Sequence, residues 1–270
     1  MTHFAGLFLD RPRIMGIVNV TPDSFADAGE TFDHEAAIER GRQHIEDGAD
    51  IIDVGGESTR PGATPVDPEE ECRRVLPVVT ALAEAGAIVS IDTRNAGTME
   101  QAVGAGAAIV NDVTALTYDP KSLEVAAGSG ASVVLMHMRG TPETMTRQSG
   151  YYDVVAKVFR YLETRIQACR EAGIPMNRLA IDPGIGFAKT ASQNFEVLDR
   201  LAEFTALTCP LLIGVSRKFG LDKPPHERLE HSLPLAIRAI EQGADIVRVH
   251  DVADTRRAID VWLEGRNELK

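Results

Sequence analysis

The sequence feature that most constrains the fold is an alternation that repeats eight times along the chain. Short apolar runs, of the kind that form buried parallel strands, each end in one or more polar residues. In the clearest case, residues 211–218, five apolar or small residues precede a serine, an arginine and a lysine. The polar ends recur about every 33 residues between Asn19 and His250, close to the average spacing in a (β/α)8 barrel.

We expect strands over residues 14–19, 51–55, 88–92, 109–112, 132–137, 179–182, 211–216 and 246–250. Helical patterns cover residues 34–47, 69–84, 96–104, 121–127, 154–172 and 254–263, and the last helix is expected to pack beside the first. A glycine that stops a helix precedes four of the strands, at Gly48, Gly106, Gly173 and Gly243. This order predicts a single α/β domain over residues 1–270, a (β/α)8 TIM barrel. The alternative is a doubly wound open sheet, but no G-x-G-x-x-G follows the first strand.

Composition narrows the classes of partner. A formal net charge of −12 disfavours nucleic acid and anionic membranes as partners, although a local basic cluster can still bind a small anion. The three cysteines match no zinc spacing, so we expect them to be buried in a reducing compartment. Residues 1–13 lack the apolar core of a signal peptide, and no apolar run reaches 18 residues. These features predict a cytoplasmic protein.

Polar side chains at the strand ends form two chemical sets, and in a barrel this end of the strands carries the active site. The first set suits a diphosphate with Mg²⁺ and comprises Asn19, Thr59, Arg60, Lys218, Arg248 and His250. The second set suits a ligand rich in N–H donors, such as an aminopyrimidinone ring, and comprises Asp92, Asn111 and Asp182.

Each assignment has a structural alternative. Asp92 and Asp182 are also suited to capping the helices that follow them. Arg60 fits a surface loop, and His137 fits a satisfied core histidine better than a ligand. Arg248 and His250 alternate with two valines and so point to one side of their strand, where an ion pair with an aspartate in the barrel lumen is the alternative for Arg248.

Seven motifs, in this order, resemble those of the dihydropteroate synthase family of pterin-binding barrels. They are Asn19-Val-Thr-Pro-Asp-Ser-Phe25, Gly55-Gly-Glu-Ser-Thr-Arg-Pro-Gly62, Ser90-Ile-Asp-Thr93, Asn111-Asp112, Asp182-Pro-Gly-Ile-Gly-Phe187, Ser216-Arg-Lys218 and Arg248-Val-His-Asp251. The resemblance runs from Ile14 to Trp262. It implies condensation of 6-hydroxymethyl-7,8-dihydropterin diphosphate with 4-aminobenzoate to give dihydropteroate and pyrophosphate.

The resemblance also implies residue roles. The pterin positions are Asp92, Asn111, Asp182, Lys218 and Arg248. The diphosphate positions are Asn19, Arg60, Arg248 and His250, with Mg²⁺ as the cofactor and Asn19 as its ligand. The aminobenzoate positions are Phe25, Thr59, Pro61, Phe187 and Lys218. The residues expected to act in catalysis are Asp92, Lys218, Arg248 and His250.

In the family the C–O bond to diphosphate is thought to break before the amine attacks, so no protein nucleophile is expected, and a homodimer is usual. The sequence departs from the family after Lys218, where the loop is about four residues short and lacks a hydroxyl that often holds the aminobenzoate carboxylate. Two rival functions remain. The short loop favours a non-catalytic pterin-binding paralogue. A pterin-dependent methyltransferase domain would not need the diphosphate set.

Overall fold

The computed structural model describes residues 3–21, 34–60, 62–220, 223–224 and 227–268. Eight parallel strands form one sheet in the order β8-β7-β6-β5-β4-β3-β10-β9. Their bounds are β3 Arg13–Asn19, β4 Ile51–Gly55, β5 Val89–Asp92, β6 Ile109–Asp112, β7 Ser132–Met136, β8 Leu179–Asp182, β9 Leu212–Ile213 and β10 Ile246–Val249. A parallel bridge between Ile181 and Leu211 joins the two edges of the sheet. The predicted barrel is therefore confirmed.

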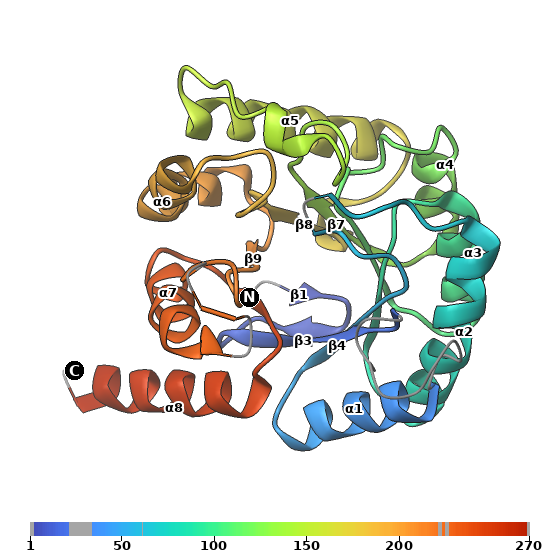
Figure 1. Cartoon of the computed structure of the whole chain (residues 1–270), viewed down its shortest axis with the longest axis horizontal. Coiled ribbons are helices and arrows are strands. Elements are labelled where there is room, and N and C mark those ends of the chain that lie inside the picture. The colour runs from blue at the N-terminus through green and yellow to red at the C-terminus, as the bar shows by residue number, and fades with distance from the viewer. Residues whose placement is uncertain (1–2, 22–33, 61, 221–222, 225–226, 269–270) are drawn as a thin grey trace.

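Eight α-helices surround the strands in the described part of the chain (Figure 1). They are α1 His34–Glu46, α2 Pro68–Glu84, α3 Ala96–Gly104, α4 Ser122–Ser129, α5 Val154–Glu171, α6 Ala191–Asp199, α7 Leu229–Glu241 and α8 Val252–Glu268. Short 3-10 helices cover Met145–Arg147, Met176–Arg178 and Leu201–Leu207. As expected, α8 lies beside α1 (Figure 1). The side chain of Arg256, in α8, approaches Gly48, two residues after the end of α1.

Local sequence explains where these helices begin and end. Asp67 caps α2 by accepting a hydrogen bond from the backbone N–H of Glu69 at 2.9 Å, with Pro68 in the first turn. Asp153 caps α5 in the same way, through the N–H of Ala156 at 2.9 Å. The four predicted stop glycines all have positive φ, between 93° and 109°, a conformation that glycine adopts without a steric penalty.

Seven strands lie within one residue of their predicted bounds, and the seventh in chain order does not. We expected residues 211–216, but β9 covers only Leu212–Ile213. The chain turns after Gly214: the N–H of Lys218 bonds to the carbonyl of Val215 at 3.3 Å, and Arg217 has a φ of 59°. This turn ends the ladder early.

The amino-terminal end of the barrel has a floor that the sequence analysis missed. Strands β1 His3–Phe4 and β2 Leu7–Phe8 form an antiparallel hairpin whose two loop residues, Ala5 and Gly6, both have positive φ. The hairpin places Phe4, fully buried, in an apolar cluster with residues from seven barrel strands. Burying such a side chain contributes about 2–3 kcal/mol.

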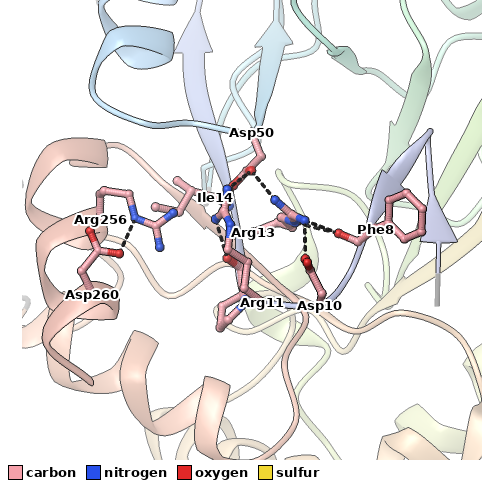
Figure 2. A network of polar contacts seen from close by, with 9 residues as sticks. Phe8, Asp10, Arg11, Arg13, Ile14, Asp50, Arg256 and Asp260 are labelled. Carbon is pink, nitrogen blue, oxygen red and sulfur yellow. Dashed lines mark hydrogen bonds and ion pairs between the residues drawn. The ribbon is translucent and has the colours of Figure 1, made fainter. Parts of the chain in front are cut away.

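A polar network ties this floor to the barrel (Figure 2). Arg13 donates from Nε to the carbonyl of Phe8 at 2.8 Å and from Nη1 to Asp50 Oδ1 at 3.0 Å. Arg11 Nη2 also contacts Asp50 Oδ1, at 2.6 Å. Asp50 Oδ2 accepts the backbone N–H of Ile14 at 2.9 Å. The hairpin, β3 and the start of β4 are therefore held together by paired charges.

Candidate active site

A cavity of about 1290 Å³ opens at the carboxyl ends of the strands. Seven of the sequence-predicted site residues line it: Asn19, Thr59, Arg60, Phe187, Lys218, Arg248 and His250. Three others, Asp92, Asn111 and Asp182, are at least 90% buried at the ends of β5, β6 and β8. Phe25 and Pro61 lie outside the described residues. The strand ends thus bring residues from distant parts of the sequence to one place.

Arg248 joins the two chemical sets that the sequence suggested were separate. Its Nε donates to Asp53 Oδ2 and its Nη2 to Asp92 Oδ2, both at 2.6 Å. The lumen ion pair considered as the alternative for Arg248 is therefore present, although the side chain also lines the cavity. Burial, the largest influence, raises the pKa of Asp92 to about 7, whereas the Arg248 charge acts in the opposite direction.

Asp53 is a site residue that the sequence analysis missed. It is fully buried within β4, and besides Arg248 its Oδ2 accepts the side-chain N–H of Asn111 at 3.1 Å. Its Oδ1 has no hydrogen-bond partner among the described residues. A lone aspartate inside an apolar strand was the available signal, because an unpaired carboxylate there is costly.

Asp182 and Lys218 form the second part of the lumen. Asp182 Oδ1 accepts the N–H of Gly184 at 2.7 Å, so it caps the turn after β8 and not the helix considered as its alternative. Burial raises the pKa of Asp182, and the Lys218 charge opposes that shift. Lys218 Nζ donates to the carbonyl of Ile185 at 2.7 Å and lies 4.7 Å from the centre of the Phe187 ring. Burial lowers the pKa of Lys218 to about 8.

His250 contacts Ser216 in a pair that resembles a nucleophile and its base. Ser216 Oγ and His250 Nδ1 are 3.0 Å apart, and the same Oγ accepts the backbone N–H of His250 at 3.2 Å. Burial, followed by the neighbouring charges of Arg217 and Arg248, lowers the pKa of His250 to about 3. Asp251, the adjacent carboxylate, is bound to Arg217. An imidazole with a lowered pKa is a weak base, which argues against a nucleophilic role for this pair.

The loop after β4 is anchored by a buried ion pair that the sequence did not reveal. Glu57 accepts two hydrogen bonds from Arg94, at 3.0 and 2.8 Å, and a third from the N–H of Val66 at 3.1 Å. This fixes the base of the loop that carries Thr59 and Arg60 at the mouth of the cavity. Arg60 is exposed, which agrees with the alternative that it is a surface-loop residue, and it also lines the cavity.

Two other polar residues at the strand ends have structural roles. Asp112 accepts hydrogen bonds from the N–H and hydroxyl of Thr114, both at 2.7 Å, and from the N–H of Leu116 at 2.9 Å. His137 is a satisfied core histidine, as its preferred alternative states: it is 1% exposed and its Nδ1 lies 3.1 Å from Lys189 Nζ. Lys189 also lines the cavity, and the sequence analysis did not identify it.

The loop after Lys218, which the sequence analysis expects to be short, is braced by residues on its carboxyl side. Arg228 donates to the carbonyls of Lys223 at 2.7 Å and Arg217 at 3.0 Å, and the hydroxyl of Ser232 accepts the N–H of Arg217 at 2.8 Å. These bonds fix the backbone on both sides of Lys218.

A magnesium ion fits this site only as a loosely held ion. In the described ranges no group of three or more His, Cys, Asp or Glu side chains is arranged to hold a metal. The half-buried Asn19 offers one amide oxygen at the end of β3, beside the cavity. Mg²⁺ commonly keeps several waters and binds substrate phosphates with few protein ligands, so this donor set suits it.

No helix in the described part of the chain has the length and apolar character needed to cross a membrane. The three cysteines are free and buried, as expected.

Comparisons with known proteins agree with the geometry. Residues 15–250 match the model of the pterin binding enzyme family. Over 260 residues the chain is 47% identical to dihydropteroate synthase of Escherichia coli, and this alignment covers 94% of this chain and 92% of that protein. A probable bifunctional folylpolyglutamate synthase/dihydropteroate synthase of Haloferax volcanii is 46% identical over 96% of this chain, which spans 31% of that longer protein.

A solved structure gives the same result. Dihydropteroate synthase of Xanthomonas albilineans with 4-aminobenzoic acid superposes with a TM-score of 0.91 at 46% identity, over 97% of this chain and 96% of that chain. The sequence motifs, the barrel and these comparisons lead to one conclusion: the chain belongs to the dihydropteroate synthase family of pterin binding enzymes.

Proposed function

We propose that this chain condenses 6-hydroxymethyl-7,8-dihydropterin diphosphate with 4-aminobenzoate, giving 7,8-dihydropteroate and pyrophosphate in folate biosynthesis, with the roles below for its own residues. The observation that carries the assignment is the charge balance of the lumen. Three buried carboxylates, Asp53, Asp92 and Asp182, lie under a cavity mouth that is basic. Arg248 is shared by the first two, and the charges of Lys218 and Lys189 act on Asp182. Two carboxylates that share one arginine keep free acceptor capacity, which suits a ring with several N–H donors.

In this proposal the pterin ring occupies the lumen. Asp92, Asn111 and Asp182 bind its amino-pyrimidinone edge, and Lys218 donates to its carbonyl. Arg248 covers the face of the ring, as a planar guanidinium can. Its contacts with Asp53 and Asp92 keep that guanidinium in the lumen beforehand. Asp53 orients both Arg248 and Asn111 through its hydrogen bonds to them.

The diphosphate is assigned to the cavity mouth. Arg60, Arg248 and His250 contribute positive charge or N–H donors there, and Asn19 contributes an amide group. Mg²⁺ bound at Asn19 supplies charge neutralisation for the diphosphate oxygens. Because the pKa of His250 is low, its imidazole is neutral and acts as a hydrogen-bonding group.

The aminobenzoate is assigned to the side of the cavity formed by Thr59, Phe187 and Lys218, with Phe25 and Pro61 from outside the described residues. Phe187 is 7% exposed and packs in an apolar cluster with Met138 and Met145. The chemical demand on the protein is to stabilise the charge on the leaving diphosphate and to keep water from the pterin-methyl cation. Arg60, Lys218 and Arg248 meet the first demand, and the apolar cluster meets the second.

The homodimer and the cytoplasmic location stay predictions. Of the rival functions, a pterin-dependent methyltransferase would leave the basic mouth without a purpose. A non-catalytic paralogue would bind pterin without turnover, and the assay below separates it from an enzyme.

The test is product formation by the purified chain. The pterin diphosphate, 4-aminobenzoate and Mg²⁺ are incubated with the wild-type chain and with Lys218→Met, and dihydropteroate is detected by mass spectrometry. Lys223→Met, a change in the same loop outside the lumen, is the matched control. We expect product from the wild-type and control chains and little from Lys218→Met. No product from the wild-type chain under any condition would contradict the proposal.

A further inference from the structure

The loop between β8 and α6 has an unusual backbone. Within residues 183–188, Gly184 and Gly186 have φ values of 73° and 83°, and Ala188 has a φ of 48°, a region that residues with a side chain rarely adopt. A Cβ atom at Gly184 would meet the carbonyl oxygen of His137 at 2.0 Å, so the loop passes directly against the end of β7. A loop in this conformation needs contacts that hold it there.

Lys189 provides those contacts. Its ammonium donates to the carbonyls of Gly184 at 2.8 Å and Phe187 at 3.1 Å, and to His137 Nδ1 at 3.1 Å. These three hydrogen-bond acceptors are neutral, and the nearby Asp182 carboxylate also attracts the Lys189 charge. Burial lowers the pKa of Lys189 to about 7. The Lys189 ammonium therefore holds the β8–α6 loop at two of its carbonyls.

His137 is a fixed partner for this ammonium. Its backbone N–H donates to the carbonyl of Asp182 at 3.0 Å, and its ring meets the edge of the Tyr161 ring with centroids 4.9 Å apart. Burial lowers the pKa of His137 to about 2, so the imidazole is neutral and Nδ1 accepts the Lys189 hydrogen bond. The loop is therefore fastened to β7 through Lys189.

The same loop determines two features of the cavity. The carbonyl of Ile185 accepts from Lys218 Nζ at 2.7 Å, and the ring of Phe187 lies 4.7 Å from that same nitrogen. The two carbonyls that Lys189 holds belong to Gly184, directly before Ile185, and to Phe187 itself. A change in the Lys189 contacts would therefore move the Phe187 ring and the anchor of Lys218 together.

We propose that Lys189 is a positioning residue for the second substrate, fixing the Phe187 ring and the Ile185 carbonyl so that the aminobenzoate side of the cavity is formed before that substrate binds. The inference rests on the proposed function. It assigns Lys189 a role in substrate binding without contact between Lys189 and the reacting atoms. Lys218 is shared by both substrates, but the pterin side depends on Lys189 less, because its other residues Asp92, Asn111 and Asp182 end strands that are held by sheet hydrogen bonds.

The test compares Lys189→Met, which removes the ammonium, with Lys189→Arg, which keeps a cation, and with Lys121→Met, an exposed lysine, as the control. Steady-state kinetics give KM for each substrate, and circular dichroism checks folding. For Lys189→Met we expect the KM for 4-aminobenzoate to rise at least about 10-fold while that for the pterin diphosphate changes less than about 3-fold. Lys189→Arg should recover part of the loss, and Lys121→Met should match the wild type.

Several outcomes would overturn the inference. Equal changes in both KM values, or no change, in a folded Lys189→Met chain would show that Lys189 serves stability alone. If Lys189→Met does not fold, Lys189→Arg provides the test. The inference then requires that its KM for aminobenzoate rise at least about 3-fold while the KM for the pterin diphosphate stays unchanged. An unchanged KM for aminobenzoate overturns the inference. A wild-type chain that makes no dihydropteroate refutes the proposed function instead, so the two failures are distinct.

Discussion

The two ends of the barrel both join arginines to aspartates, yet they balance charge differently. At the floor, Arg11 and Arg13 face Asp10 and Asp50, and Asp50 also accepts a backbone N–H (Figure 2). Each carboxylate there has a cation, and the contacts tie the hairpin to the barrel. Such a network fits a stabilising role.

At the carboxyl end, Arg248 serves two carboxylates, Asp53 and Asp92, and the nearby Asp182 faces Lys218. One arginine is thus shared by two carboxylates, and burial raises the pKa of both Asp92 and Asp182. This arrangement is expensive for the folded protein, and a ligand that brings N–H donors relieves it. This difference supports the proposal that the unbalanced end binds the ligand.

The largest expected effect comes from Asp182→Ala at the unbalanced end. Losing a charged acceptor for the pterin ring should weaken pterin diphosphate binding by about 2–4 kcal/mol, measured by calorimetry. Asp153→Ala is the matched control, because that aspartate also accepts a backbone N–H but caps α5. Unchanged pterin affinity in Asp182→Ala would remove this residue from the site.

The floor should respond in the opposite way. Arg13→Met removes charged hydrogen bonds to Asp50 and to the carbonyl of Phe8, so the free energy of unfolding should fall by about 1.5–3 kcal/mol. Both KM values should stay as in the wild type. Arg257→Met, which breaks an exposed pair with Asp254, should change stability by less than about 1 kcal/mol. Urea unfolding and kinetics check these outcomes, and a raised KM in Arg13→Met would break the division between the two ends.

The third expected effect is a pH dependence of stability at Asp92, spread over several pH units. Its pKa is raised by burial from 3.8 to about 7, so the folded state holds a proton that the unfolded state has lost between these values. The unfolding free energy of the wild type should therefore fall relative to Asp92→Asn as pH rises from about 4 to about 7, by at most about 1.4 kcal/mol per pH unit. Above about pH 7 the difference should level off. Unfolding curves that show a rise instead would mean that pairing with Arg248 outweighs burial.

The sequence predicted the periodic parts of this molecule well. Buried strands such as Ile51–Gly55 and stop glycines such as Gly106 are local signals, because each depends on a few neighbouring residues. The ends of parallel strands must meet at one face of a barrel, so Asn19, Arg248 and His250 could be placed at one cavity without a structure. Their individual roles in binding stay predictions.

Features that depend on distant partners were not predictable. Asp53 looks like an isolated polar residue until Arg248, 195 positions later, is seen to bind it. Lys189 reads as a loop lysine, and its partner His137 lies 52 positions earlier. The strands of the floor hairpin are two residues each, too short for a periodic signal, and its Ala5-Gly6 turn lacks the usual Asn-Gly.

The most direct test of the central claim is a calorimetric titration of the pterin diphosphate into Asp92→Asn at pH 8, with Arg13→Met titrated alongside. The substitution keeps the shape of the side chain and removes one charge from the unbalanced end. We predict that Asp92→Asn binds at least about 10-fold more weakly than the wild type, although it is no less stable, while Arg13→Met binds normally. Wild-type affinity in Asp92→Asn would contradict the claim that the buried carboxylates of the lumen are there to bind the ligand.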